Sequence, residues 1–439
     1  MIWESLLSLK RFGDTNKRLR IEQDNLRLGF EVDYDRIVFS NAFRSLQDKT
    51  QVIPFSKTDF VHTRLTHSLE VSVVGRSLGR MAGHAILQKH PHLKESLGYQ
   101  SNDFGAITAA ASLAHDIGNP PFGHSGEKAI GHFFSSGKGV KYMNKLTGKE
   151  YQDLCDFEGN ANGFKILTES HPGTQGGLRL SYATLGAFVK YPKASLPVKP
   201  TPHVADKKYG YFQSQKTFFK EVADELSLID GEKIFRHPLT YLVEAADDIC
   251  YTIIDFEDGI NLGWISEEFA LEYLINLVKD QIDSKKYAQL AYKPQRLSYL
   301  RALAINSMIK DAVDTFIDNE QNILLGTFSQ SLLEKSRFKP QIEDIIKISV
   351  ENVYQSKEVI QKEVMGHRAI TTLLEYYCEA AVRSFNNKAN VHDKLILSLV
   401  PEGISMAGKT LYETLLNSSC FVASLSDGKA LRMAKDIGG

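Results

Sequence analysis

Apolar residues recur at intervals of three and four positions along most of this chain, and this spacing limits the possible folds more than any other feature. An α-helix brings such positions onto one face. Pro238 has the character of a first-turn proline, and the stripe that follows it consists of Leu239, Leu242, Ala246, Ile249, Ile253 and Phe256. Strand-like stretches are few, and strands and helices do not alternate as in a parallel sheet. The sequence therefore predicts an all-α protein with little β structure.

Glycines at a four-residue interval predict close packing of a second helix, over residues 66–87. Gly75, Gly79 and Gly83 would lie on one face, where a neighbouring helix could approach closely. In a membrane this spacing would indicate a dimer motif, but Arg76 and Arg80 lie among the glycines, which favours packing in a soluble core. An alanine-rich segment predicts a third helix over residues 104–116.

Two segments have the composition of loops. Residues 137–149 are rich in glycine and lysine, and four prolines crowd residues 192–202. A long proline-rich loop in a compact protein is often functional. Helical patterns continue from about Trp264 onward without a clean linker or an internal repeat. We therefore expect one large helical unit with a helical C-terminal part.

The charge balance and the cysteines place the chain among ordinary cytoplasmic proteins. Its 52 basic and 53 acidic side chains give a net charge of −1, so a nucleic-acid partner would need a local basic patch. The four cysteines include no CxxC pair, which favours a reducing compartment. The N-terminal segment becomes charged too early for a signal peptide, and the longest small-apolar run, residues 106–114, is far shorter than the roughly 18 residues of a membrane span. We expect a soluble cytoplasmic protein.

The segment HDIGNPPFGHSGE, residues 115–127, is the strongest candidate for chemistry. A helix is expected to end at His115–Asp116, and Gly118 and Pro120–Pro121 then force a tight turn before a new helix begins. The dyad can offer a cation one nitrogen and one oxygen ligand. His124 and Glu127 would be close enough to handle protons on a metal-bound water. The alternative is a polar corner between two helices with a capping acid.

A His-Asp pair alone carries little information, because the chain holds a second pair, His392–Asp393, before an apolar run. There the aspartate is expected to cap a helix. A lone histidine such as His67 is also usually structural. His67 gains weight from Arg64, three residues earlier on the same helical face. A cation beside a metal-binding histidine is favourable when an anion such as phosphate lies between them.

Asp247, Tyr251 and Asp255 lie four apart on the helix after Pro238, among further acidic residues. A solvated acidic face would have the same pattern. Like charges four apart are mildly destabilising, however, and no lysine or arginine occurs over residues 238–258 to offset them. A bound cation would relieve the repulsion, and spacing alone does not decide between the two interpretations.

Phosphate-binding motifs of the glycine-rich kind, the P-loop and GxGxxG, are absent from the sequence. The basic candidates for contacting phosphate are Arg64, Lys190 beside Tyr191, and Lys207–Lys208. For any single lysine, an ordinary surface charge is the simpler interpretation.

Together these motifs resemble a known family. A histidine, a His-Asp pair and a distant aspartate, in this order, are the pattern of the HD superfamily of helical metal-dependent phosphohydrolases. The segments that give a closer resemblance, to the bacterial deoxyguanosine triphosphate triphosphohydrolases (dGTPases), are RSLQDKTQV, HTRLTHSLEV, HDIGNPPFGHSGE, FEGNANG, LVEAADDICY and FVASLSDGKAL. We therefore expect one unit over residues 1–439, with an HD catalytic core over residues 40–260 and a helical C-terminal subdomain over residues 261–439.

The resemblance implies a role for each candidate residue. The implied metal ligands are His67, His115, Asp116 and Asp247. The implied catalytic pair is His124 and Glu127, with Glu127 steering His124. Asp247 is preferred to Asp248 because Tyr251 and Asp255 follow it at the spacing of the family. The implied substrate contacts are Gln51 near the deoxyribose 3′-hydroxyl, Arg64 at a phosphate, and Asn119, Asn160, Lys190, Tyr191, Tyr251 and Asp255.

The implied reaction is hydrolysis of a deoxynucleoside triphosphate (dNTP), dGTP before others, to the deoxynucleoside and inorganic triphosphate. Its cofactor would be a divalent metal ion, Mn²⁺ or Mg²⁺ first, although two histidines and two aspartates would also accept Fe, Co or Zn. A broad-specificity dNTPase or an HD nucleotidase is the neighbouring alternative, and a regulator that binds single-stranded nucleic acid is the alternative from another class. The resemblance also implies self-association, as a hexamer or else a tetramer, and single-stranded DNA as a further partner. No membrane partner is expected.

Overall fold

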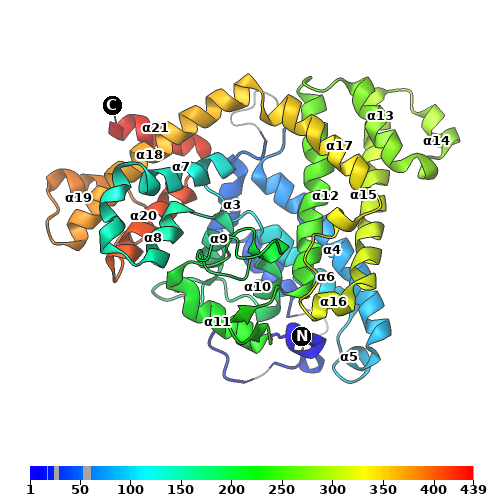
Figure 1. Cartoon of the computed structure of the whole chain (residues 1–439), viewed down its shortest axis with the longest axis horizontal. Coiled ribbons are helices and arrows are strands. Elements are labelled where there is room, and N and C mark those ends of the chain that lie inside the picture. Colours follow the sequence, from blue (N-terminus) through cyan, green and yellow to red (C-terminus); the bar gives the residue numbers. More distant parts are fainter. Residues whose placement is uncertain (17, 24–28, 53–60, 439) are drawn as a thin grey trace.

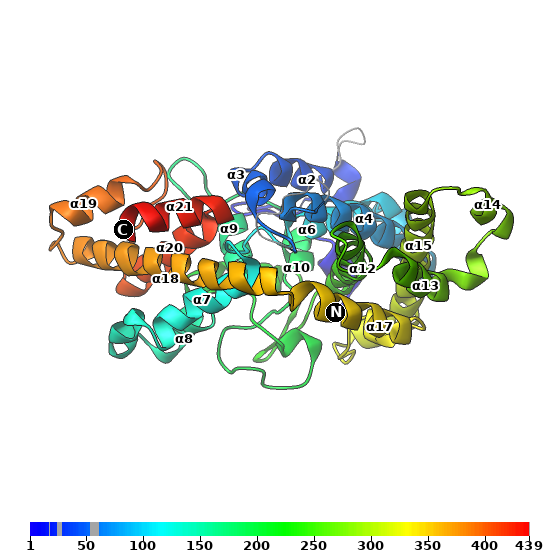
Figure 2. The ribbon, with the colours of Figure 1, turned by 90° about the horizontal axis from the view of Figure 1, so that it is seen from above.

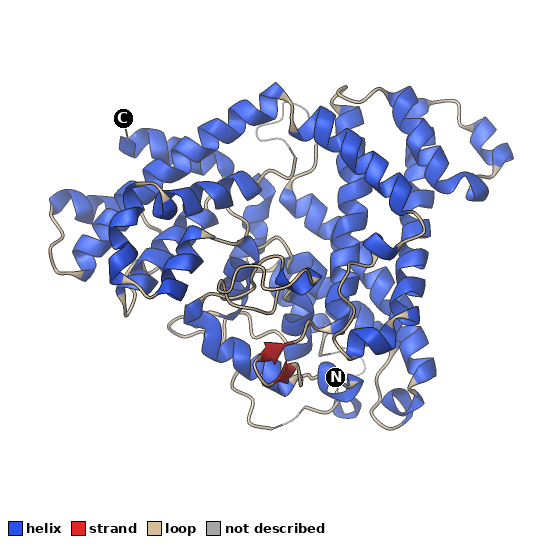
Figure 3. Cartoon of the chain, viewed as in Figure 1, coloured by secondary structure: helices blue, strands red, loops and turns tan. Residues whose placement is uncertain are grey.

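Helices dominate the computed structural model, which describes residues 1–16, 18–23, 29–52 and 61–438 (Figure 3). In this part of the chain the strands are limited to β1 (Ile229–Asp230) and β2 (Lys233–Ile234), an antiparallel pair in which Ile229 faces Ile234. The prediction of an all-α protein with little β structure is confirmed. None of the described helices combines the length and the apolar character that crossing a bilayer requires.

A first group of helices packs around one hydrophobic core, in the centre and on the right of Figure 1. Its central members are α4 (Arg64–Lys89), α6 (Ser101–Ala114) and α12 (Pro238–Asn261), in which Pro238 occupies the first turn as predicted. The remaining members are α1 (Trp3–Leu6), α2 (Glu31–Val38), α3 (Asn41–Arg44), α5 (Pro91–Glu95), α10 (Tyr182–Phe188), α11 (Lys216–Glu225), α13 (Glu267–Val278), α14 (Ser284–Gln289), α15 (Lys293–Asp318), α16 (Glu320–Leu324) and α17 (Lys339–Ser349).

The glycine-spaced face of α4 packs directly on α6. A Cβ atom on Gly79 would lie 2.0 Å from the Thr108 hydroxyl and 2.6 Å from the Phe104 carbonyl oxygen, and Gly75 and Gly83 are equally crowded by α6. The predicted close approach is therefore confirmed, with α6 as the partner. The helix is longer than the predicted 66–87, because Thr63 caps it and draws the first turn back to Arg64. The predicted third helix, residues 104–116, is α6, which begins and ends slightly earlier.

A second group of helices packs around a second core, on the left of Figure 1. It joins residues 122–157 to residues 370–430, and α9 (Gly159–Thr168) contributes to both cores. Its helices are α7 (Gly123–Ser135), α8 (Gly148–Cys155), α18 (Lys357–Phe385), α19 (Val391–Ser398), α20 (Leu411–Ser424) and α21 (Asp427–Gly438). The long helix α18 runs from one group to the other, as Figures 1 and 2 both show. The subdomain boundary after residue 260 stays a prediction, and the two cores divide the chain elsewhere.

Short helical turns occupy several connections. One of them corrects a prediction: residues 137–149, expected to be a loop, contain a 3₁₀ helix and the start of α8. The proline-rich residues 192–202 do lie in irregular structure. The turns are η1 (Arg20–Glu22), η2 (Ser45–Asp48), η3 (Lys138–Lys145), η4 (Val204–Asp206), η5 (Gln213–Gln215), η6 (Lys279–Gln281), η7 (Leu333–Lys335) and the π-helical η8 (Val350–Tyr354).

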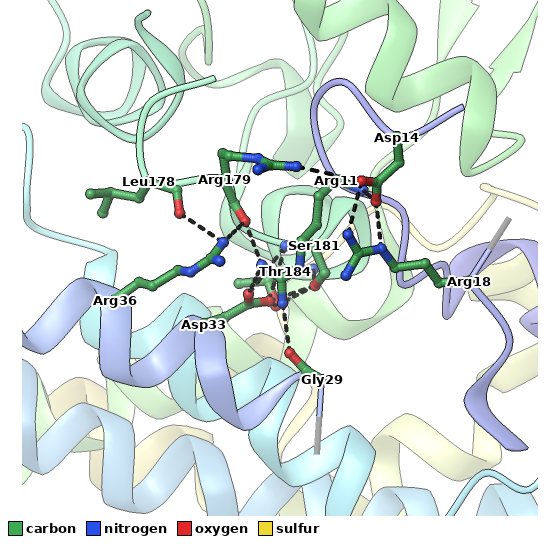
Figure 4. Close-up of polar contacts among 10 residues, drawn as sticks. All are labelled: Arg11, Asp14, Arg18, Gly29, Asp33, Arg36, Leu178, Arg179, Ser181 and Thr184. Atoms are coloured by element: carbon green, nitrogen blue, oxygen red, sulfur yellow. Dashed lines mark hydrogen bonds and ion pairs between the residues drawn. The ribbon is translucent and has the colours of Figure 1, made fainter. Parts of the chain in front are cut away.

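A buried carboxylate fixes α10, the helix that leads into Lys190. Asp33 of α2 is fully buried and forms a 2.5 Å ion pair with Arg11. It also accepts hydrogen bonds from the Ser181 amide, the Ser181 hydroxyl at 2.6 Å and the Thr184 hydroxyl at 2.7 Å (Figure 4). Because Ser181 is the N-cap of α10, this cluster anchors the start of the helix that leads to Lys190.

Candidate active site

Three helices of the first group bring the four predicted metal ligands together. His67 lies in the first turn of α4, His115 and Asp116 follow the end of α6, and Asp247 lies on α12. The Nε2 atoms of His67 and His115 lie 3.3 and 3.4 Å from Asp247 Oδ1, and His115 Nε2 lies 3.5 Å from Asp116 Oδ1. Ligand atoms of His67, His115 and Asp116 all lie within 4.8 Å of one another.

The donor atoms fit a divalent cation. His115 Nδ1 lies 2.7 Å from the Ser112 carbonyl oxygen, which can only accept, so Nδ1 carries the ring proton. The lone pair of His115 Nε2 then faces the aspartates. This Nε2 atom is buried and has no hydrogen-bond partner within the described part of the chain. An oriented imidazole beside carboxylate oxygens is the usual environment of a bound divalent metal.

Each of the two aspartates also meets a basic side chain. Arg64 forms an ion pair with Asp116, and Lys190 Nζ lies 2.5 Å from Asp247 Oδ2. Burial alone would raise the pKa of both carboxyl groups, but the charges of Arg64 and Lys190 hold each pKa below its ordinary value. Both aspartates are therefore carboxylates at neutral pH, the form that a cation needs.

The acidic side of α12 is not a solvated face, which removes that alternative. Glu244 is 7% exposed, and Asp255 and Asp258 are fully buried. The compensating charges come from other segments: Arg236 Nη1 lies 2.8 Å from Glu244 Oε2, and His62 Nδ1 lies 2.8 Å from Asp258 Oδ1. The sequence of α12 contains no basic residue, and the fold brings basic side chains to it from other segments.

A cavity of about 450 Å³ opens beside the predicted metal ligands. It brings together predicted residues from both groups of helices, namely His115, Asp116, Asn119, His124, Glu127, Asn160, Lys190, Tyr191, Asp247 and Tyr251. His67, Gln51, Arg64 and Asp255 do not line it. The side-chain amide oxygen of Gln51, Oε1, is buried and has no hydrogen-bond partner among the described residues.

His124 and Glu127 lie in the first turns of α7, and the side chains of both approach Lys208. Lys208 Nζ lies 3.5 Å from His124 Nε2 and 3.8 Å from Glu127 Oε2. Burial first, and then the Lys208 charge, lower the pKa of His124, while burial raises the pKa of Glu127. Among the described residues, His124 and Glu127 share no direct hydrogen bond; Glu127 Oε1 instead accepts from the Gly159 amide at 2.7 Å. His124 is therefore neutral near pH 7 and able to accept a proton.

The remaining predicted contacts are held by hydrogen bonds at the cavity wall. Asn119 Nδ2 donates to Asp116 Oδ1 at 2.6 Å, and Asn160 Nδ2 donates to Glu158 Oε1 at 2.6 Å. Tyr251 stacks on Tyr354, with ring centroids 6.0 Å apart, and Tyr354 donates to the buried Asp255. Burial raises the pKa of Asp255 to about 7.

Comparisons with known proteins agree with this geometry. The HD domain family model matches residues 64–174, the segment that holds His67 and the His115–Glu127 turn. The deoxyguanosinetriphosphate triphosphohydrolase-like protein of Synechocystis sp. is 40% identical over 451 residues, which cover 100% of this chain and 99% of that protein. The chain belongs to the deoxyguanosinetriphosphate triphosphohydrolase family.

Further members of the triphosphohydrolase family match over most of the chain. The triphosphohydrolase-like protein of Pseudomonas aeruginosa is 36% identical over 448 residues, covering 100% of this chain and 99% of that protein. The deoxyguanosinetriphosphate triphosphohydrolase of Salmonella paratyphi A is 32% identical over 426 residues, covering 87% of this chain and 83% of that protein. The resemblance predicted from the motifs is confirmed, and the chain is an HD-domain hydrolase.

The triphosphohydrolase cavity also has walls that the sequence did not reveal. Glu158 contacts Lys208 at 3.0 Å and lies within the FEGN motif, from which only Asn160 was singled out. A face of α17 contributes Lys339, Ile342, Glu343 and Ile346. Their spacing of three and four residues is typical of one helix face, but nothing in the sequence connects that face with His115. The second pair, His392–Asp393, lies elsewhere, on the first turn of α19. The N-cap of this helix is Asn390, and Asp393 takes part in the capping by accepting from the Asn390 amide.

Proposed function

We propose that this chain hydrolyses deoxynucleoside triphosphates, dGTP in preference, to the deoxynucleoside and inorganic triphosphate. One observation carries the proposal: the donor set of His67, His115, Asp116 and Asp247 adjoins a cavity whose other walls hold His124 and several lysines, among them Lys190 and Lys208. A triphosphate is a polyanion, and Lys190 and Lys208 offer it positive charge. The printed names of the relatives support dGTP as the substrate.

In the proposed reaction, a water oxygen bonds to the α-phosphorus and the bond to the 5′-oxygen breaks. His67, His115, Asp116 and Asp247 would hold a divalent ion, which polarises the phosphoryl oxygen and lowers the pKa of water. His124, kept neutral by burial and by Lys208, takes the proton of the attacking water. The 5′-oxygen takes a proton from solvent water and leaves as the hydroxyl of the deoxynucleoside, and His124 returns its proton to the solvent. Lys190 and Arg64 stabilise the charge that gathers on the triphosphate.

Selection of the sugar is proposed to occur at the tyrosine wall. Tyr251 lines the cavity and is held by its stack on Tyr354. A rigid aromatic wall would leave no room for a 2′-hydroxyl group, which disfavours ribonucleotides. Gln51, next to Thr50, is proposed to meet the 3′-hydroxyl.

A turnover panel tests the proposal. The four dNTPs and GTP are each incubated with Mn²⁺ or Mg²⁺, and inorganic triphosphate is separated from orthophosphate. We expect triphosphate release, fastest from dGTP and slowest from GTP. Equal rates for all four dNTPs would favour a broad-specificity dNTPase, and orthophosphate release from monophosphates would favour an HD nucleotidase. His124→Ala with full turnover and intact metal binding would contradict the assignment of His124.

The remaining predictions concern partners and location. Self-association as a hexamer, or else a tetramer, is proposed from the resemblance and is tested by light scattering. A regulatory role for single-stranded DNA is tested by an affinity that falls with salt, and DNA binding without turnover in any metal would favour the regulator over the enzyme. A cytoplasmic location is proposed from the reduced cysteines.

A further inference from the structure

A carboxylate at the far C-terminal end reaches into the turn that carries the catalytic pair. Asp427 is the first residue of α21 and is 2% exposed. Its Oδ1 accepts a hydrogen bond from the Phe122 amide at 3.0 Å, and its Oδ2 accepts from the Thr50 amide at 3.0 Å and from the Thr50 hydroxyl. One side chain therefore joins three distant parts of the sequence.

Thr50 connects this carboxylate to the start of α4. Thr50 and Thr63 form an antiparallel bridge, and the Arg64 amide donates to the Lys49 carbonyl oxygen at 3.1 Å. Thr63 caps α4, whose first turn holds Arg64 and His67. The position of Thr50 thus bears on one predicted metal ligand and one predicted phosphate contact.

Phe122 connects the same carboxylate to the start of α7. Phe122 is a bulky residue with φ of 61°, in the left-handed region that side chains of this kind rarely adopt. It directly precedes α7 and so sets the direction of His124 and Glu127. Its ring packs on Gly366 of α18, where a Cβ atom would lie 2.5 Å from the ring. The hydrogen bond from the Phe122 amide to Asp427 and the contact with Gly366 together hold the strained residue in place.

Helix capping does not explain the position of Asp427. An acidic residue in the first turn of a helix is often present only to favour the helix dipole. In α21 the capping role falls to Ser426, whose hydroxyl accepts from the Lys429 amide. The Asp427 side chain is instead buried between two other segments. Lys49 reinforces the same junction, because its Nζ donates to the Asn119 carbonyl at 2.6 Å and to the Ala423 carbonyl at 2.8 Å.

We infer that Asp427 is a positioning residue for catalysis, which acts through Phe122 on His124 and Glu127 and through Thr50 on the start of α4. The inference rests on the proposed function for its kinetic readout. The C-terminal helices α18 and α21 would then be part of the catalytic apparatus, although they contribute no group to the cavity wall. Activity should depend on the three hydrogen bonds that Asp427 accepts rather than on the negative charge alone.

The test compares Asp427→Ala, Asp427→Asn and Thr50→Val with Asp436→Asn, a change at an exposed residue of the same helix. A misplacement of about 1 Å costs on the order of 100-fold in rate. We therefore expect kcat of Asp427→Ala to fall about 10- to 100-fold, with KM within about threefold of wild type. Asp427→Asn sets an N–H group against the amide of either Phe122 or Thr50. This variant and Thr50→Val should show smaller losses in the same direction. Combining Thr50→Val with Asp427→Ala should add little.

Hydrogen exchange supplies a readout that does not depend on turnover. Peptides that span residues 119–124 should exchange faster in Asp427→Ala and at the wild-type rate in Asp436→Asn. If folded Asp427→Ala has wild-type kcat and wild-type exchange, the inference is wrong. If Asp427→Ala does not fold, Asp427→Asn and Thr50→Val decide by the same criteria. Wild-type enzyme that releases no triphosphate would instead contradict the proposed function, and the exchange measurement would still test the positioning of Phe122.

Discussion

At the scale of single residues, the neighbouring Asp247 and Asp248 make the sharpest contrast. Both lie on α12 and both line the cavity, but only Asp247 approaches the two histidines. We expect Asp247→Asn to weaken Mn²⁺ binding at least about 10-fold, the loss that even an outer partner of a metal causes. Asp248→Asn is the matched control and should keep its Mn²⁺ affinity within about threefold. Calorimetry measures both; equal losses in the two variants would contradict the ligand assignment.

Lys208 and His124 give a prediction for pH. Because burial and the Lys208 charge lower the pKa of His124, its neutral form persists below pH 6.5. The acidic limb of kcat/KM should lie below that pH in wild type. Lys208→Ala removes the repulsion, so the imidazolium becomes more favourable and the limb should move to higher pH. Lys220→Ala, at an exposed residue of α11, is the control. A limb that stays or moves to lower pH would show that His124 does not govern it.

The sequence identified candidate site residues better than it identified the side chains that they interact with. His115 and the turn that follows it stood out through the nearby Gly118 and Pro120–Pro121. Asp247 could not be separated from a solvated face, because its Lys190 partner and the Arg236 partner of Glu244 lie outside α12. Spacing along one helix contains no information on charges that other segments bring to it.

At the scale of elements, the contact between α4 and α6 controls how close His67 lies to His115. We expect Gly79→Ala to destabilise the protein by about 1–3 kcal/mol, because the new methyl group must displace the backbone at Phe104. Because this change would move α4 away from α6, it should also weaken Mn²⁺ binding. Gly148→Ala, at the start of α8, is the matched control, since no atom lies within 4 Å of its Cβ position. That change should be neutral or stabilise by up to about 1 kcal/mol.

Denaturant unfolding, with and without Mn²⁺, measures both glycine variants. Wild-type stability in Gly79→Ala would mean that α4 and α6 separate without cost. The sequence predicted both helices and a close approach to the glycine face of α4, because glycine spacing is a local signal, but it did not identify α6 as the partner. It did not predict the 3₁₀ helix over Lys138–Lys145. Glycine has a low helix propensity, and burial of Tyr142 against the second core provides the stabilisation instead.

At the scale of the whole molecule, two cores meet at the cavity, and the sequence did not reveal this division. Residues 122–157 pack with residues 370–430, and pairing across such a distance leaves no periodic trace in one sequence. The predicted metal ligands lie on α4, directly after α6 and on α12, all in the first group, while His124 and Glu127 come from the second. On the proposed function, a metal ion would therefore contact one group only, and a nucleotide would span both.

This division predicts how ligands protect the two groups from hydrogen exchange. Ligand at about 100 times its Kd stabilises the native state by about 2.7 kcal/mol, which slows exchange through the corresponding openings up to about 100-fold. Mn²⁺ alone should protect peptides of α4 and α12 and leave those of α7 near the rate of the free protein. Mn²⁺ with a non-hydrolysable dGTP analogue should protect α7 as well. Asp247→Asn controls for metal that binds elsewhere, because it should lose the first effect. Equal protection of α7 by Mn²⁺ alone would mean that the two groups open as one unit, and then the nucleotide would not be the link between them.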